Sequence, residues 1–203
     1  MGRWPGRYHA RVADPGAPLT LAMLRAEALE CTRCPLAAGR TQVVFGVGDP
    51  DADLMFVGEA PGRDEDLVGE PFVGRSGQLL DRLVLEELGL DRSQFYIANV
   101  VKCRPPDNRD PKAEEIASCR PYLEAQRRAI RPAVVVSLGN FATKLLLDTD
   151  LGITKVRGSA YPMDGWQLVP TYHPAAALRS GGVVLAEMRA DLIRAKRLLD
   201  PSP

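Results

Sequence analysis

The chain has 203 residues, of which 45% are hydrophobic, and 26 acidic residues balance 26 basic ones to give a formal net charge of zero. This length suits one sizeable α/β domain and is too short for two. With no net positive charge, a nucleic-acid partner would need a local basic patch. No run of about 18 apolar residues is present, so the sequence predicts no membrane span.

Residues 1–18 are rich in glycine, proline and arginine. They predict a flexible N-terminal arm, followed by a single domain over residues 19–200. The arm lacks the apolar centre of a secretory signal. We therefore expect a cytoplasmic protein in which the four cysteines do not form two disulfides.

Helical and strand-like patterns alternate after the arm. In chain order they are a helix over 19–30, a strand over 54–57, a helix over 76–88, a strand over 95–101, a helix from Asp110 towards Ile130 with a kink or restart at Pro121, a strand over 133–138, a helix over 140–147, a strand over 167–171 and a helix over 184–199. This alternation indicates a mostly parallel sheet covered on both faces. Sites in such folds lie at the carboxyl ends of the strands.

The four cysteines predict a metal site. Cys31 and Cys34 form a CxxC pair, and Cys103 and Cys119 complete a four-thiolate set. The alternative is four buried thiols, which are common in protein cores. Spacing alone does not separate zinc from an iron–sulfur cluster, although the lack of a second CxxC pair favours iron–sulfur. We expect a structural role.

A glycine-rich segment, "GEAPGRDEDLVGEPFVGRSG", follows the first predicted strand. Such turns often hold phosphate, but the acids of this one would repel phosphate. Four acids of this segment are candidates to bind metal or activate water, namely Glu59, Asp64, Glu65 and Asp66, and a solvated acidic loop is the alternative. Phe72 is either a stacking platform for a planar ligand or a core residue.

Two further residues lie near strand ends. Asn99 offers an amide donor and acceptor side by side, as reading a nucleobase edge requires, or it is satisfied by backbone. His173 precedes Pro174 and can donate to an oxygen that gains charge, or it is a capping or core residue.

Taken together, these motifs resemble the uracil-DNA glycosylase superfamily. The matching segments are "GEAPG", "EPFVGRSGQLL", "YIANVVKCRPP" and the "HP" after the last strand, and the four cysteines resemble those of its family 4. The resemblance implies an α/β three-layer sandwich with a central, mostly parallel four-stranded sheet flanked by helices. It also implies a structural 4Fe-4S cluster on the four cysteines. The implied activity is hydrolysis of the bond between uracil and deoxyribose in single- or double-stranded DNA, by a monomer.

The resemblance also implies roles for single residues. Phe72 stacks on uracil, Asn99 pairs with its edge, and His173 donates to the charge developing on O2. Glu65 lies near C5 of the base. Glu59 positions water or supports the sugar cation.

Further implied contacts surround the base and the DNA. Backbone N–H groups near Ala60 and Gly62 hold the base, and Leu178 is a wedge in a loop over residues 173–182. Arg179 contacts phosphate, and the segment Cys103–Cys119 with its two flanking residues could present Lys102, Arg104, Arg109 or Arg120 to the phosphate backbone.

Three alternatives bear on the function. A non-catalytic module that binds uracil-containing DNA or a nucleotide would not require both His173 and Glu59. A dinucleotide-binding fold would need GxGxxG, which the segment from Gly58 to Gly62 lacks. A related branch holds its DNA product covalently through a histidine after the Asn strand; that region has no histidine here, so we expect ordinary turnover.

Overall fold

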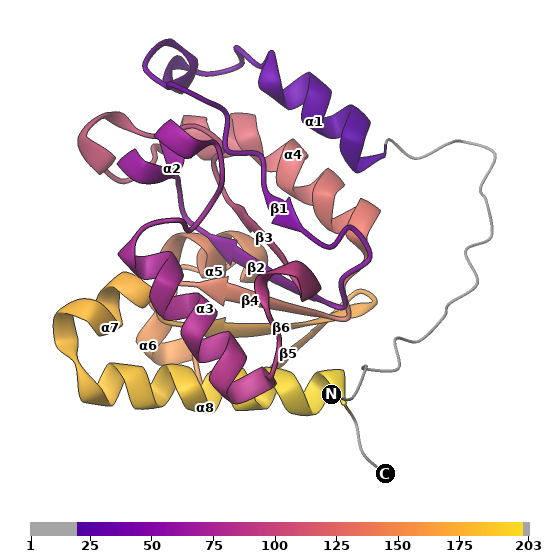
Figure 1. The fold of residues 1–203 in the computed structure, drawn as a ribbon, viewed down its shortest axis with the longest axis vertical. Coiled ribbons are helices and arrows are strands. Elements are labelled where there is room, and N and C mark those ends of the chain that lie inside the picture. Colours follow the sequence, from indigo (N-terminus) through magenta and orange to yellow (C-terminus); the bar gives the residue numbers. More distant parts are fainter. Residues whose placement is uncertain (1–19, 201–203) are drawn as a thin grey trace.

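A computed structural model describes residues 20–200, so the predicted arm lies outside the described residues. A central sheet separates two layers of helices (Figure 1). The strands are β1 (Val47–Gly48), β2 (Leu54–Gly58), β3 (Tyr96–Asn99), β4 (Val134–Leu138), β5 (Tyr161–Met163) and β6 (Trp166–Thr171). The α-helices are α1 (Leu21–Leu29), α2 (Arg63–Val68), α3 (Arg75–Leu88), α4 (Ala113–Ile130), α5 (Asn140–Leu147), α6 (Ile153–Val156), α7 (Pro174–Ser180) and α8 (Gly182–Leu199). Short 3-10 helices are η1 (Pro35–Ala38), η2 (Arg92–Gln94) and η3 (Pro106–Asn108).

The sheet has the strand order β1-β3-β2-β4-β6-β5. The four inner strands are parallel and correspond to the four predicted ones, which confirms the mostly parallel α/β sheet. The number of strands is six rather than four, because β1 and β5 pair antiparallel at the two edges. Each edge strand has only two or three residues, which is too short to show an alternating pattern.

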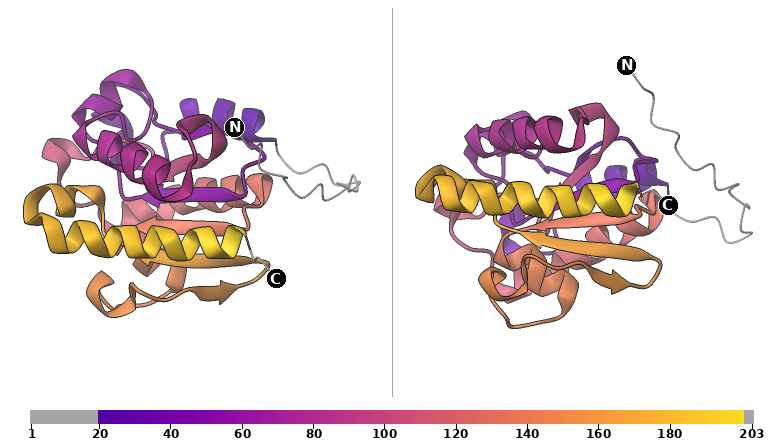
Figure 2. Two further views of the ribbon diagram at one scale, coloured as in Figure 1. Left: turned by 60° about the horizontal axis from the view of Figure 1, so that its bottom comes forward. Right: turned by 90° about the horizontal axis from the view of Figure 1, so that it is seen from below.

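Alternate residues of the inner strands enter two different hydrophobic cores. Along β2, Leu54 and Phe56 face the core beneath α3 and α8, which lie side by side on one face of the sheet (Figure 2). Met55 and Val57 face the core beneath α1, α4 and α5 on the other face. The sheet is therefore buried on both sides, which explains why its strands read as continuous apolar runs.

The start of α4 and its course differ from the prediction. The helix begins at Ala113 rather than at Asp110, and the carboxylate of Glu115 accepts a hydrogen bond from the backbone N–H of Lys112 at 2.8 Å. It then runs unbroken through Pro121. Pro121 lies on the exposed side, whereas Tyr122 and other residues of the opposite side are buried, so packing maintains the helix despite the missing N–H.

The segment over residues 173–182 is not the predicted loop. Its central part forms α7, and His173 serves as the N-cap with Pro174 in the first turn. A proline at this position suits a helix start, and the three alanines that follow favour helix. Gly181, at φ +72°, ends α7 and begins α8. Helix α3 likewise begins at Arg75, one residue before the predicted cap Ser76.

The fold gathers one end of every inner strand at the same edge of the sheet. The starts of α2, α3 and α7 lie around this edge (Figure 1). Within residues 20–200, none of the helices has the length and apolar character needed to cross a bilayer.

Candidate active site

The predicted pocket residues lie at the carboxyl ends of three inner strands. Glu59 directly follows β2, Asn99 ends β3, and His173 lies two residues beyond β6. The register of β2 and β3 pairs Gly58 with Asn99. A Cβ atom at Gly58 would lie 2.5 Å from Asn99 Oδ1 and 2.6 Å from the ring of Phe72. Only glycine therefore lets these two side chains approach the strand end together.

Asn99 presents a buried acceptor that no protein group uses. The residue is 1% exposed, and its Oδ1 has no hydrogen-bond partner within residues 20–200. Its backbone carbonyl, in contrast, accepts a hydrogen bond of 2.7 Å from Lys102 Nζ. Buried polar atoms almost always have a partner. The free Oδ1 can therefore accept a hydrogen bond from a ligand that brings its own N–H group.

The ring of Phe72 lies beside the imidazole of His173. Their ring centroids are 5.5 Å apart and the planes are inclined by 31°. Phe72 is buried and has φ +57°, a left-handed conformation that is unusual for a bulky residue. Such a conformation persists only where its surroundings fix it.

Contacts from α3 and η2 fix the turn that carries Phe72. The guanidinium of Arg92 donates to the carbonyl oxygens of Pro71 and Phe72, and to the carboxylate of Asp81 at 2.8 Å. In the first turn of α3, a Cβ atom at Gly77 would lie 1.6 Å from the carbonyl oxygen of Phe72. The helix therefore packs directly on this carbonyl, which only glycine permits.

Glu65 ties together the two loops that border the pocket. Its carboxylate accepts hydrogen bonds from the backbone N–H groups of Gly62 at 3.1 Å, and of Val73 and Gly74 at 3.0 Å each. Ala60 and Gly62 lie in the turn between β2 and α2. Glu65 thus joins this turn to the turn of Phe72, and its predicted place near C5 of the base remains a prediction.

His173 combines a capping role with a free donor. Its Nδ1 accepts a hydrogen bond of 3.2 Å from the N–H of Ala175. Burial lowers the pKa of His173 to about 4, and Arg179 acts in the same direction while Glu65 opposes it. The imidazole is therefore neutral near pH 7. Because Nδ1 accepts, its proton resides on Nε2, which can donate to a ligand.

Glu59 is poised between its two protonation states near neutral pH. Burial raises the pKa of its carboxyl group to about 7, and the negative charge of Asp110 adds to this shift. A carboxyl group of this pKa suits general-base work or the support of a developing cation at neutral pH.

Exposed apolar and basic groups meet where α7 joins α8. Leu178 is 43% exposed, and Arg179 is exposed beside it. Val183, at the start of α8, is 75% exposed and was not singled out in the sequence. Two exposed apolar residues beside an arginine form a surface that can approach a nucleic-acid groove.

The predicted phosphate contacts after β3 differ in availability. Lys102 is 2% exposed, so its prediction as a phosphate contact is wrong. Arg109 forms an ion pair of 2.6 Å with Glu115, and Arg120 one of 2.6 Å with Glu124. Arg104 has no carboxylate partner within residues 20–200, and its Nε donates to the side chain of Asn108 at 2.7 Å.

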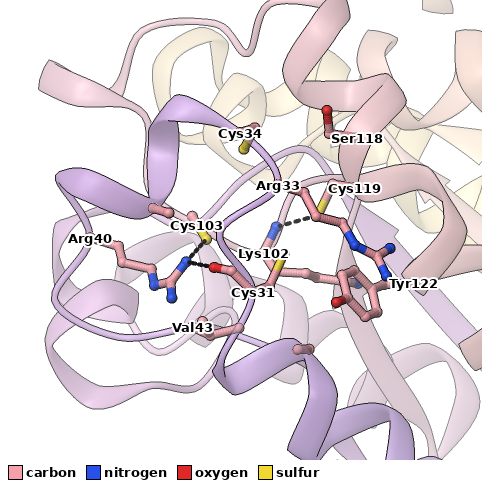
Figure 3. A pocket seen from close by; sticks show the side chains of 12 residues that line it. Cys31, Arg33, Cys34, Arg40, Val43, Lys102, Cys103, Ser118, Cys119 and Tyr122 are labelled. Atoms are coloured by element: carbon pink, nitrogen blue, oxygen red, sulfur yellow. Dashed lines mark hydrogen bonds between the residues drawn. The ribbon is translucent and has the colours of Figure 1, made fainter.

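The four cysteines line a single cavity (Figure 3). Cys31 and Cys34 lie in the link between α1 and η1, Cys103 follows β3, and Cys119 lies in α4. All four are unpaired thiols. Within residues 20–200, no three side chains of the types that ligate metals converge as a single ion would require. The sulfur atoms surround the cavity from three separate segments instead.

Arginine and backbone N–H groups point at the sulfur atoms. Arg40 donates to Cys103 Sγ at 3.4 Å and to the carbonyl of Cys31 at 2.6 Å, and the backbone N–H of Lys102 donates to Cys119 Sγ at 3.3 Å (Figure 3). Burial raises the pKa of Cys103 to about 11 and raises that of Cys119 too. These thiols would bind metal with release of protons. Soft donors supported by N–H···S bonds fit an iron–sulfur group.

The family model of the uracil DNA glycosylase superfamily matches residues 45–193. This chain belongs to that superfamily. Its relatives include proteins named type-4 uracil-DNA glycosylase from Thermotoga maritima (50% identical, covering 74% of this chain and 79% of the relative), Sulfurisphaera tokodaii (47%, covering 78% and 76%) and Saccharolobus solfataricus (43%, covering 90% and 88%).

Four residues of this superfamily member support the site without having been singled out for that purpose. Arg92 and Gly77 fix the turn of Phe72, and Arg40 and Lys102 border the cysteines. The one available signal was Lys102, a cation directly beside a candidate ligand and after the apolar pair Val100-Val101. Arg92 gives no signal, because the two carbonyl groups that it contacts lie twenty and twenty-one residues away in sequence.

Replacing Gly77 with alanine should displace the turn of Phe72, because the new methyl group cannot share space with the carbonyl oxygen. We expect a loss of about 3 kcal/mol in the free energy of unfolding, the upper part of the range for overpacking. Urea unfolding measures this loss. Gly39→Ala is the matched control, since Gly39 has φ −110° and no atom within 4 Å of an added Cβ. An equal loss in both variants would contradict the close packing.

Proposed function

We propose that this chain removes uracil from DNA by hydrolysing the N-glycosidic bond, which leaves free uracil and an abasic site. Membership of the superfamily and the names of the relatives support this proposal. The observation that carries it is the unpartnered buried Oδ1 of Asn99, with the ring of Phe72 beside it and a neutral His173 next to that ring.

The pocket can accept one planar base that has an N–H group at its edge. A base within a duplex must first leave the stack to reach such a pocket. Uracil would lie on Phe72, and Asn99 Oδ1 would accept from its N3–H while the amide group donates to O4. Cytosine has no N3–H and presents a donor in place of O4. Backbone N–H groups near Ala60 and Gly62 would border the base. Glu65, which joins the two turns around the pocket, would lie near C5 of the base.

The reaction separates charge, and two side chains match the two signs. As the bond from C1′ to the base breaks, its electron pair moves to uracil and the sugar becomes cation-like. The Nε2–H of His173 donates a hydrogen bond to O2, where negative charge develops. The carboxylate of Glu59 faces the sugar or positions the water. The water oxygen bonds to C1′ and releases a proton, which balances the reaction.

The substrate is DNA carrying uracil, either single- or double-stranded, and a monomer suffices. Leu178 would enter the space left by the extruded base, with Arg179 and Arg104 on the phosphates. In prokaryotes such as those of the named relatives, this substrate places the activity in the cytoplasm.

We assign Cys31, Cys34, Cys103 and Cys119 as the ligands of a structural 4Fe-4S cluster. The donor set and the N–H groups directed at sulfur support the assignment. When bound, the cluster supplies a cross-link between segments and no redox step. It would connect the link between α1 and η1, which carries Cys31 and Cys34, to the segment after β3 and to α4.

The decisive experiment uses oligonucleotides that carry one uracil, with thymine in the same position as the control. Uracil strands should yield an abasic site that alkali cleaves, and thymine strands should not. Gel separation of the cleaved products measures this activity. No abasic product from either single-stranded or duplex uracil DNA would contradict the proposal.

The alternative, a module that binds uracil-containing DNA without cleaving it, is separated by His173→Ala. Loss of the Nε2–H donor should slow the chemical step by about a hundredfold, as the removal of one charge-stabilising donor does. DNA binding, measured by fluorescence anisotropy, should weaken far less, because only the cap of α7 is lost there. Equal losses in both quantities would assign His173 to binding.

The pH dependence should follow Glu59 and not His173. Below pH 7 the carboxyl group of Glu59 gains a proton and loses the charge that faces the sugar, so kcat/KM should fall as the pH drops through about 7. His173 stays neutral down to about pH 4 and adds no step in this range. Glu59→Gln should therefore give a lower and flat profile between pH 5 and 8. A step that persists in Glu59→Gln would contradict this assignment.

Purified protein should be brown and contain about four irons per chain, as thiolate-ligated clusters of this kind do. Iron analysis and the visible absorption spectrum measure this. Colourless protein that holds one zinc ion would contradict the cluster.

A further inference from the structure

Lys102 is a buried cation with no acidic partner. Its side chain is among the most fully buried of the described residues, and it lines the cavity that the four cysteines surround (Figure 3). In the described range, 20–200, no carboxylate lies within ion-pairing distance of its ammonium group. A buried polar group needs hydrogen-bond partners, so the contacts of Lys102 show what holds its side chain in place.

At the cavity, the backbone of Lys102 meets two of the cysteines. The sulfur of Cys119 accepts a hydrogen bond from the backbone N–H of Lys102 at 3.3 Å, and Cys103 is the next residue in the chain. A change in the position of these two sulfur atoms would therefore be transmitted to the backbone of Lys102.

On its other side, Lys102 contacts the residue that reads the base. Its Nζ donates to the backbone carbonyl of Asn99 at 2.7 Å, so the ammonium bonds the last residue of β3. The backbone carbonyl of Lys102 accepts a hydrogen bond of 2.8 Å from the N–H of Val44. This bond joins Lys102 to the segment that follows the CxxC pair. Lys102 thus bridges the cysteine cavity and the base pocket.

We propose that Lys102 is a positioning residue that couples the metal centre to uracil recognition. The centre would hold the backbone of Lys102 through Cys103 and Cys119, and the side chain of Lys102 fixes the backbone of Asn99 so that Oδ1 stays aimed into the pocket. This inference rests on the proposed function. The cluster would then affect the affinity of the pocket for uracil, in addition to joining segments of the chain.

The test compares Lys102→Met with Lys112→Met. Methionine keeps most of the length of the lysine side chain and removes its charge. Lys112 lies further along the chain, between Cys103 and Cys119, and its side chain is 62% exposed. Two readouts are taken on each iron-loaded protein: the inhibition constant of free uracil, and the rate at which iron is lost to a chelator.

Lys102→Met should weaken inhibition by uracil about tenfold per iron-loaded molecule, as loss of a hydrogen bond from a charged donor does, and should release iron faster. Lys112→Met should match wild type in both readouts. A purely structural role would lower the melting temperature without changing uracil inhibition. Wild-type inhibition in Lys102→Met would overturn the inference.

A second variant decides the matter if Lys102→Met does not fold. Lys102→Arg keeps the cation but not the geometry of the bond to Asn99, so it should hold iron and still bind uracil more weakly. Wild-type inhibition in Lys102→Arg would then overturn the coupling. Wild-type protein that lacks iron or activity would overturn the proposed function, and this inference with it, whereas an active, iron-loaded wild type confines any failure to Lys102.

Discussion

The close pairing of β2 with β3 is the constraint on which the rest of the site depends. It sets Gly58 opposite Asn99, and the missing side chain of Gly58 opens the space that Asn99 and the ring of Phe72 approach. Any larger residue would separate them. Because this contact forms where two parallel strands end, the sheet fixes the position of the Asn99 amide, while Arg92 and Gly77 fix the turn that carries the ring of Phe72.

Most charged side chains near the pocket bond backbone groups and so hold the loops in place. Arg92 and Glu65 both bond backbone groups of the loops that border Phe72. Burial keeps His173 neutral, and it holds the pKa of Glu59 near neutrality. The acidic loop that looked unsuited to phosphate is thus consistent with a site where a sugar, not a phosphate, gains charge.

The sequence predicted the parallel strands and the strand-end residues well, because buried strands read as continuous apolar runs and their carboxyl ends converge. It did not predict β1 and β5, which are too short for any periodic signal. It also took the segment after His173 for a loop. The support of Phe72 by Arg92 was inaccessible, because that contact forms only when the chain folds η2 against the turn.

The two ring nitrogens of His173 face different tasks. Nδ1 caps the helix that carries Leu178, and Nε2 holds a proton that a ligand in the pocket can accept. A substitution at His173 therefore changes two things at once: the start of α7 loses the acceptor for the N–H of Ala175, and the pocket loses the ring that lies beside Phe72. A single side chain thus encodes both the start of a helix and a wall of the pocket.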